Sequence, residues 1–285
     1  MSNFDGVHRG HARLIAEVVA QADRLQAPTL VMTFDPPPQA ILVPADVCIP
    51  LTPIPRRADL LSELGVDMVV AYPTDGQLLS LSARDFFQQI IVNTFHASGM
   101  VEGPNFRFGR DRSGGVDLLD ELCRHQAISF SVVEAAADAT GMISSTRIRG
   151  LLADGDIAAA NAMLTQSYQL SGIVSPGAQR GRELGFPTAN LTDIAAFIPA
   201  HGVYAGCVTI AGRRFQAAIN IGPNPTFDEA QAKVEVHILG WSGTLYGQSL
   251  CCTLTKRIRE VRRFASVGDL RAQIEKDVAE VANGH

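Results

Sequence analysis

A change in the hydrophobic pattern near residue 166 constrains the fold of this 285-residue chain more than any other feature. Before that point, short apolar runs such as residues 29–34 and 128–133 alternate with segments whose apolar residues recur every three or four positions, the period of an amphipathic helix. Strands separated by helices pack as a parallel sheet covered on both faces. Residues 1–165 are therefore predicted to form a doubly wound, Rossmann-like α/β domain.

Residues 166–285 follow a different pattern, because five or six apolar strands succeed one another without intervening helices. A final segment places Leu270, Ile274 and Val278 on one helical stripe. This half is therefore predicted to be a small antiparallel β-barrel with a C-terminal helix. The expected strands are residues 168–174, 203–210, 213–221, 233–239 and 249–258.

Composition narrows the choice of partners and compartment. A net charge of -5 offers no basic surface for nucleic acid or an anionic membrane, and no apolar run approaches the thickness of a bilayer. The five cysteines form no Cys-x-x-Cys pair, which indicates a reducing compartment such as the cytoplasm. Small-molecule substrates are therefore expected, whereas the oligomeric state stays open.

Two histidines, His8 and His11, stand three residues apart in the opening segment Asn-Phe-Asp-Gly-Val-His-Arg-Gly-His. If a helix begins there, both rings project from one side of its first turn. The free N–H groups and partial positive charge of that helix end, together with two imidazole donors, would suit a triphosphate. A metal site or two surface histidines remain the alternatives.

A second polar loop, Ile-Ser-Ser-Thr-Arg-Ile-Arg at residues 143–149, follows the last strand of the α/β half. Its hydroxyl groups, including those of Ser145 and Thr146, can cap a helix, and Arg149 in the first turn would favour an anion. In doubly wound sheets such loops lie where ligands bind, beyond the carboxyl ends of the strands. An ordinary cap with solvated arginines is the alternative.

In the barrel half, Gly177, Gly181 and Gly185 are spaced by four and precede Thr188 and Asn190. Backbone at glycines can approach phosphates closely. The two later side chains are neutral oxygen donors on a turn stiffened by proline, and they suit Mg²⁺ that takes its other ligands from ATP and water. The loop therefore predicts a magnesium–nucleotide site.

The strand at residues 233–239 alternates strictly, so Glu235 and His237 share the face opposite to its valines. A carboxylate at Glu235 could accept a proton from a substrate hydroxyl that attacks a γ-phosphate. A solvent-facing glutamate on a half-exposed strand is the alternative interpretation.

Three motifs in this order resemble the bifunctional riboflavin kinase/FAD synthetase family over nearly the whole chain. They are the His-x-Gly-His turn, the Ile-Ser-Ser-Thr-x-Ile-Arg loop and the Gly-Arg-x-Leu-Gly-x-Pro-Thr-Ala-Asn loop. The resemblance implies an FMN adenylyltransferase domain of the nucleotidyltransferase superfamily, followed by a riboflavin kinase barrel. The implied substrates are riboflavin, FMN and ATP, with Mg²⁺ as cofactor.

The resemblance also implies roles for individual residues. His8 and His11 would bind the ATP phosphates and stabilise charge during adenylyl transfer, and Asn105 would lie at the flavin side of that site. In the barrel, Glu235 would be the catalytic base. The remaining implied contacts are the triphosphate ligands Ser145, Thr146 and Arg149, the Mg-ATP ligands Thr188 and Asn190, and the flavin-side residues Arg259 and Phe264.

The chain departs from the family pattern at three places. Pro37 replaces the histidine of the usual Phe-x-Pro-His-Pro segment, and Ser2 stands where the family has glycine. The family also has a strand ahead of the Asn-Phe-Asp-Gly turn, which here follows only Met1 and Ser2. Two alternatives to the bifunctional enzyme therefore stay open: a riboflavin kinase with an impaired adenylyltransferase half, and a non-catalytic flavin-binding or regulatory protein.

Overall fold

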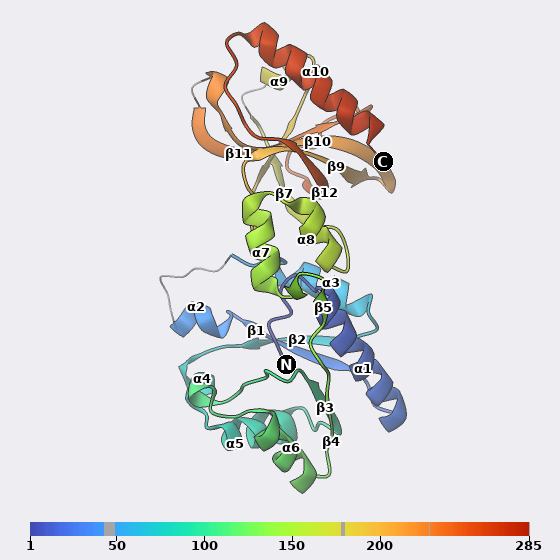
Figure 1. The fold of residues 1–285 in the computed structure, drawn as a ribbon, viewed down its shortest axis with the longest axis vertical. Helices are drawn as coiled ribbons and strands as arrows, with labels where there is room; N and C mark the ends of the chain where they lie inside the picture. Colours follow the sequence, from blue (N-terminus) through green and yellow to red (C-terminus); the bar gives the residue numbers. More distant parts are fainter. Residues whose placement is uncertain (43–48, 178–179, 228, 285) are drawn as a thin grey trace. The chain divides into compact units, whose positions relative to one another are not determined.

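The computed structural model describes residues 1–42, 49–177, 180–227 and 229–284, which form two compact units (Figure 1). The first unit is Met1–Cys48 with Thr52–Ser144, and the second is Ile49–Leu51 with Ser145–His285. By this division the helices between residues 145 and 163 group with the barrel. The domain boundary at residues 165 and 166 stays a prediction.

Helices and strands alternate in the first unit, as the hydrophobic pattern predicts. One helical segment begins as an α-helix at Ala83 and continues from Phe87 as a π-helix, η1. The elements are α1 (Arg9–Leu25), β1 (Leu30–Asp35), α2 (Pro38–Leu42), α3 (Ile54–Ser62), β2 (Met68–Pro73), α4 (Gly76–Ser80), α5 (Ala83–Phe86), η1 (Phe87–Thr94), β3 (Gly99–Glu102), η2 (Arg110–Arg112), α6 (Val116–His125), β4 (Ser129–Val132), β5 (Ala137–Asp138) and β6 (Gly141–Met142).

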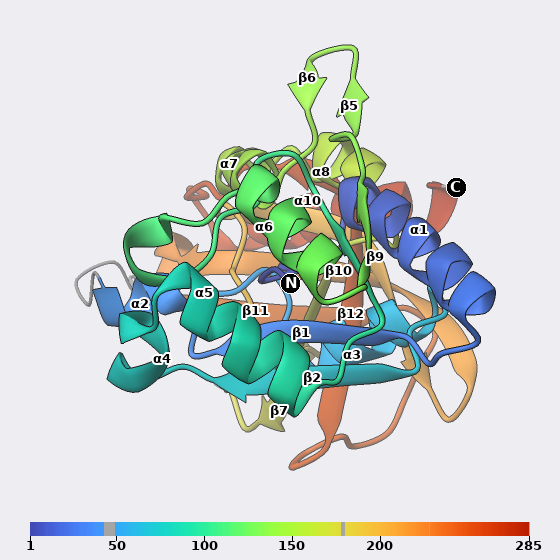
Figure 2. The same ribbon diagram turned by 90° about the horizontal axis from the view of Figure 1, so that it is seen from below.

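The parallel strands of this unit form two separate ladders. Strands β1 and β2 lie side by side (Figure 2), in register from Leu30 opposite Met68, and β3 pairs with β4. Within the described ranges no ladder joins β1 to β3, and an apolar cavity of about 260 Å³ is lined by both strands. The Ser2 N–H donates to Met32 O of β1 (3.4 Å), and the Met1 amino group pairs with buried Glu102 of β3. The predicted parallel α/β class is confirmed.

The second unit begins with α7 (Ser145–Asp154) and α8 (Ile157–Met163), followed by a closed antiparallel barrel. Its six strands are arranged in the order β10-β11-β8-β7-β12-β9, which confirms the predicted barrel. The elements are β7 (Gln169–Ser175), α9 (Arg180–Glu183), β8 (Ala189–Thr192), β9 (Gly202–Ile210), β10 (Arg213–Asn224), η3 (Pro225–Phe227), β11 (Glu229–Ile238), β12 (Ser249–Arg259) and α10 (Val267–Asn283).

The barrel interior is filled by alternate apolar residues of its strands. Ile219 and Ile221 of β10 and Val234 and Val236 of β11 are almost fully buried. Their neighbours point outward because successive strand residues face opposite sides. Helix α10 packs on the outer face of β9 and β10, where its stripe Leu270, Ile274 and Val278 helps to line a cavity. The outward-facing polar residues of β10 and β11 therefore open into a covered space.

Candidate active sites

The opening turn is held in one shape by apolar side chains buried in the first unit. Phe4 and Val7 are at most 1% exposed, and with Gly6 they adopt left-handed backbone at φ 46°, 39° and 83°. Such backbone is unfavourable for residues other than glycine, so it persists where the surrounding structure fixes it. The Gly6 N–H also donates to Thr52 Oγ1 (3.0 Å). The backbone N–H of Thr52 in turn donates to the Asp5 carboxylate (3.1 Å).

His8 and His11 form a reciprocal cap at the start of α1. His8 is the N-cap, and its Nδ1 accepts the His11 N–H, while the Nδ1 of His11 accepts the His8 N–H, both at 3.3 Å. The rings stack with centroids 3.6 Å apart. A neutral imidazole that accepts at Nδ1 carries its proton on Nε2. Both histidines therefore offer an Nε2–H donor beside the helix N-terminus.

The electrostatics of this turn keep both rings neutral. Burial lowers the pKa of His8 to about 4 against the opposing effect of Asp5. Burial and the positive charges of His8 and Arg57 lower the pKa of His11 well below its usual value. Arg57 is itself buried, donating to Thr33 Oγ1 (3.0 Å) and pairing with Asp5 (3.4 Å). The turn thus combines neutral donors with a fixed cation.

His8 and His11 line a cavity of about 820 Å³ that belongs to the first unit. Asn105 lines the same cavity, together with Phe106 and Phe108, whose rings stack at 5.6 Å. Polar donors at one side and aromatic faces at another suit a ligand with both a phosphate and a planar ring system. The sequence analysis singled out Asn105 but not the two phenylalanines that follow it at alternate positions.

The triphosphate residues predicted in the second polar loop begin α7. Ser145, Thr146 and Arg149 lie in its first turn and a half, as expected, and belong to the second unit. The Arg149 guanidinium donates to Ile49 O (2.6 Å) and lies 5.2 Å from the ring centroid of Phe197. Their contact with a triphosphate shared with the histidines stays a prediction.

In the barrel, three polar residues stand side by side on adjacent strands. Glu235 of β11 is paired directly with Asn190 of β8 and with Asn220 of β10. Direct cross-strand partners point to the same face of a sheet. Because Val234 and Val236 fill the interior, this row faces outward. Asn190 was expected in a turn and lies in the short strand β8 instead, since two ladders hold residues 189–192 extended.

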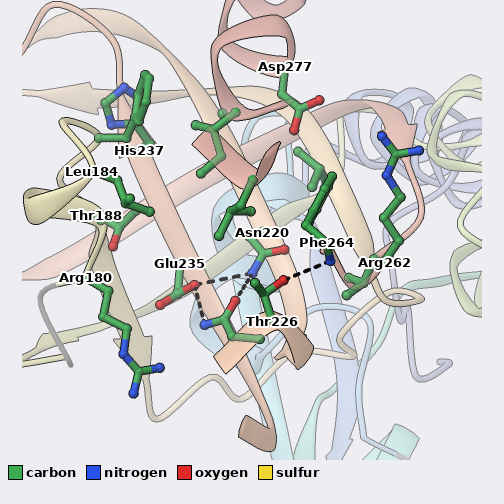
Figure 3. A pocket seen from close by; sticks show the side chains of 18 of the residues that line it. Arg180, Leu184, Thr188, Asn220, Thr226, Glu235, His237, Arg262, Phe264 and Asp277 are labelled. Atoms are coloured by element: carbon green, nitrogen blue, oxygen red, sulfur yellow. Dashed lines mark hydrogen bonds between the residues drawn. The ribbon is translucent and has the colours of Figure 1, made fainter. Parts of the chain in front are cut away.

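Glu235 and Asn220 of this row line a cavity of about 150 Å³ between the barrel face and α10 (Figure 3), whereas Asn190 is not among its lining residues. Thr188, Glu235, Arg259 and Phe264, all predicted from the sequence, line this cavity, as does Gly181. The structure thus brings these residues together. The sequence analysis missed other polar residues of the lining, which include Asn220, Asn224, Thr226 and Asp277.

Glu235 is held by two asparagine side chains. Its Oε2 accepts from Asn224 Nδ2 at 3.1 Å and from Asn220 Nδ2 at 3.3 Å (Figure 3). Asn220 Nδ2 also lies 3.4 Å from Asn224 Oδ1, so the three side chains form one network. Asn220 stands between Ile219 and Ile221, and this alternation alone signals an outward polar residue. The cross-strand register that places it against Glu235 is set by tertiary structure.

Two glycines of the predicted nucleotide loop are sites of close packing. A Cβ at Gly181 would lie 2.4 Å from Phe186 O, and one at Gly177 would lie 2.2 Å from Asn190 Nδ2. Gly185 has open space around it, but its φ of +90° favours glycine.

Thr188 and Asn190 as ligands of a nucleotide-bound Mg²⁺ stay a prediction. Two neutral oxygen donors, two residues apart, leave most coordination positions to phosphate oxygens and water, as Mg²⁺ prefers. The loop is tied to β11 by His237, whose Nδ1 lies 2.9 Å from Pro187 O. In the part of the chain that the structure describes, no group of three His, Cys, Asp or Glu side chains could hold a metal ion instead.

The segment after β12 is fastened to α10 by an ion pair. Arg259 Nε and Nη2 donate to Asp277, with closest distances of 2.9 and 2.7 Å, and Asp277 is only 4% exposed. Gln273 donates to the same carboxylate (2.8 Å) and accepts from Arg262 (2.6 Å). Both guanidinium groups lie over Phe264, 5.6 and 4.9 Å from its centroid. This network fixes one wall of the cavity.

Comparison with known proteins gives matches to both units. A family model described as FAD synthetase matches residues 1–147, and one described as riboflavin kinase matches residues 164–284. The bifunctional riboflavin kinase/FMN adenylyltransferase of Escherichia coli (strain K12) is 34% identical over 278 residues, covering 97% of this chain and 89% of that protein. The protein of the same name from Bacillus subtilis (strain 168) is 33% identical over 287 residues, covering 97% and 89%.

A solved structure described as a macrolide-efflux protein from Streptococcus pneumoniae is also similar. It is 30% identical, with a TM-score of 0.91, and the match covers 100% of this chain and 93% of that one. Among the helices of residues 1–42, 49–177, 180–227 and 229–284, none has the length and apolar character needed to cross a membrane.

Proposed function

Because the chain belongs to the bifunctional riboflavin kinase/FMN adenylyltransferase family, we propose that it phosphorylates riboflavin to FMN and adenylylates FMN to FAD, with ATP as co-substrate of both steps. The observation that carries the proposal is the row of Asn190, Glu235 and Asn220 beside Thr188 on the covered barrel face. An enzyme that uses ATP and whose described cysteines are all free also fits the cytoplasm, which we propose as its location.

In the kinase reaction, Glu235 accepts the proton of the terminal riboflavin hydroxyl as that oxygen attacks the γ-phosphorus of ATP. The new O–P bond forms while the bond to the β-phosphate oxygen breaks, and ADP leaves. Thr188 and Asn190 would hold Mg²⁺, which would supply charge neutralisation at the ATP phosphates. Arg259 and Phe264, which line the cavity, would contact the flavin.

In the adenylyltransferase reaction, an FMN phosphate oxygen attacks the α-phosphorus of ATP and pyrophosphate leaves. No covalent protein intermediate is needed, so catalysis rests on placement and on donors to the developing negative charge. The Nε2–H groups of His8 and His11 supply such donors. Ser145, Thr146 and Arg149 bind the triphosphate, and Asn105 contacts the flavin.

Two single substitutions test the assignment of one reaction to each unit. Glu235→Gln is expected to lower FMN formation from riboflavin by about 100-fold or more and to leave FAD formation from added FMN within about twofold. His11→Asn is expected to do the reverse, lowering FAD formation by about 100-fold or more. Chromatography of flavins after incubation with Mg-ATP measures both products. Absence of any phosphorylated flavin with the unaltered protein would overturn the proposal.

A second candidate is a riboflavin kinase with a weak adenylyltransferase half. The observations that favour it are that no ladder joins β1 to β3 among the described residues, and that Pro37 stands in a segment from which Phe34 and Pro38 line the histidine cavity. In the same assay this candidate yields FMN that accumulates without FAD. A non-catalytic flavin-binding protein yields neither product.

A further inference from the structure

We propose that Asn224 and Asn220 are positioning residues that set the orientation of the Glu235 carboxylate for phosphoryl transfer. The proposal rests on the riboflavin kinase function proposed above. Its starting observation is that both amide nitrogens donate to one oxygen of Glu235, Oε2, at 3.1 and 3.3 Å. The two asparagines hold the carboxylate from one side.

The strand β10 is shaped to allow this arrangement. In a regular strand, residues four apart lie about 13 Å from each other, too far for two asparagines to reach one oxygen without a bend. The pairing of β10 with β11 shifts register between Gly222 and Asn224, and Gly222 has φ +134°. Irregularities of this kind redirect a side chain, and they are frequent beside active sites. Here the register shift lies directly before Asn224, whose side chain donates to Glu235.

The network also fixes which way each amide faces. Asn220 Nδ2 lies 3.4 Å from Asn224 Oδ1, so the oxygen of Asn224 is taken as an acceptor and its Nδ2 is left to donate to Glu235. Two amide donors on one carboxyl oxygen suit the ionised form, which only accepts. Both amide groups therefore present donors, and not acceptors, to Oε2 of Glu235.

The other oxygen, Oε1, is the one available to substrate. Among the residues that the structure describes, none donates a hydrogen bond to it, and Glu235 lines the cavity beside Thr188. A glutamate has three rotatable side-chain bonds, and a base must be held close to its productive geometry to act efficiently. The asparagines supply that restraint while leaving Oε1 for the riboflavin hydroxyl.

A competing explanation is that the asparagines contact riboflavin or ATP directly, since both line the cavity. The two explanations predict different results in a double-mutant cycle of Asn224 and Glu235. If Asn224 acts through the carboxylate, its removal matters only while Glu235 is present. If it binds substrate, its removal costs the same with or without Glu235 and raises the KM.

The experiment measures kcat and KM for riboflavin phosphorylation with Asn224→Ala, Glu235→Gln and the double variant of the full chain. We expect Asn224→Ala to lower kcat by about 10- to 100-fold, as for loss of a hydrogen bond to a charged group, with both KM values within about twofold. In the Glu235→Gln background the same change should alter residual kcat by less than about twofold. Asn224→Ser, which keeps a donor, should recover part of the loss.

Controls separate this outcome from misfolding and from failure of the proposed function. Gln216→Ala changes another exposed polar residue of β10, outside the cavity lining, and should leave kcat unchanged. FAD formation from added FMN should persist in every variant. An equal loss of kcat in both backgrounds, or a raised KM at unchanged kcat, overturns the positioning role. No kinase activity in the unaltered chain overturns the proposed function itself.

Discussion

His8 is buried at the N-terminus of α1, where its pKa is lowered to about 4. Its ordinary value is about 6.5, so between these pH values the unfolded chain binds a proton that the folded chain does not. This contribution to stability is complete above pH 6.5 and is lost as the pH falls toward 4. Between pH 7.5 and pH 5.0 the loss from this one residue is about 2 kcal/mol.

Urea unfolding of the first unit at these two pH values tests that prediction. His8→Asn keeps a side-chain acceptor at the N-cap but does not titrate. The variant should therefore lose about 2 kcal/mol less than the unaltered protein between pH 7.5 and pH 5.0. An unchanged pH dependence would show that His8 is already protonated in the folded state.

The positions of single residues were predictable where a local pattern carried the information. The outward position of Glu235 follows from strand alternation, and the place of His8 and His11 at the start of α1 follows from their spacing, while their roles in catalysis stay predictions. Asn224 could not be identified, because its contact with Glu235 depends on an irregular register between β10 and β11. Asp277 was equally hidden, since an acidic residue in an amphipathic helix ordinarily faces solvent.

At the level of elements, α10 holds the end of β12 and the segment that follows it through the contacts of Asp277 with Arg259 and of Gln273 with Arg262. Asp277→Ala removes the partner of Arg259, whose side chain is only 19% exposed, and leaves a partly buried cation unpaired. We expect a loss of about 3 to 5 kcal/mol in the stability of the second unit. The KM for riboflavin should also rise, because Arg259 and Phe264 line the cavity. Denaturant unfolding and steady-state kinetics measure the two effects.

The same helix offers a matched control for that prediction. Glu280 of α10 pairs with Lys256 of β12 at 2.9 Å, but both side chains are largely exposed, at 47% and 66%. Glu280→Ala should therefore change stability by less than about 1 kcal/mol. Equal effects of the two substitutions would mean that burial of the Arg259 pair is unimportant.

Most elements of this fold were predictable from hydrophobic periodicity, and the exceptions have physical reasons. Strand β8 has only four residues and follows a proline-containing turn, so its alternation is too short to read. The two-residue strands β5 and β6 carry no pattern at all. The change from α-helix to π-helix after Phe86 could not be predicted, because the buried residues Phe87, Ile90 and Ile91 recur at the spacing of an ordinary α-helix.

At the scale of the whole molecule, the chain joins two compact units, each with its own cavity. The change from alternating helices and strands to successive strands predicted this pairing of an α/β unit with a barrel. The chemistry then follows a simple order, since the product of the barrel, FMN, is the substrate of the α/β unit. The hydrophobic pattern of the sequence does not predict whether FMN moves from one unit to the other within the same chain or is first released into solution.

Mixing two variants that each lack one of the two activities tests whether FMN is released between the steps. Glu235→Gln alone makes little FMN from riboflavin, and His11→Asn alone accumulates FMN. Because each cavity lies within its own unit, FMN released by the second variant should reach the first variant through solution, and the mixture should form FAD from riboflavin and Mg-ATP. The rate should increase with the concentration of the Glu235→Gln variant. A mixture that accumulates FMN without FAD, although Glu235→Gln converts added FMN, would show that FMN is not released.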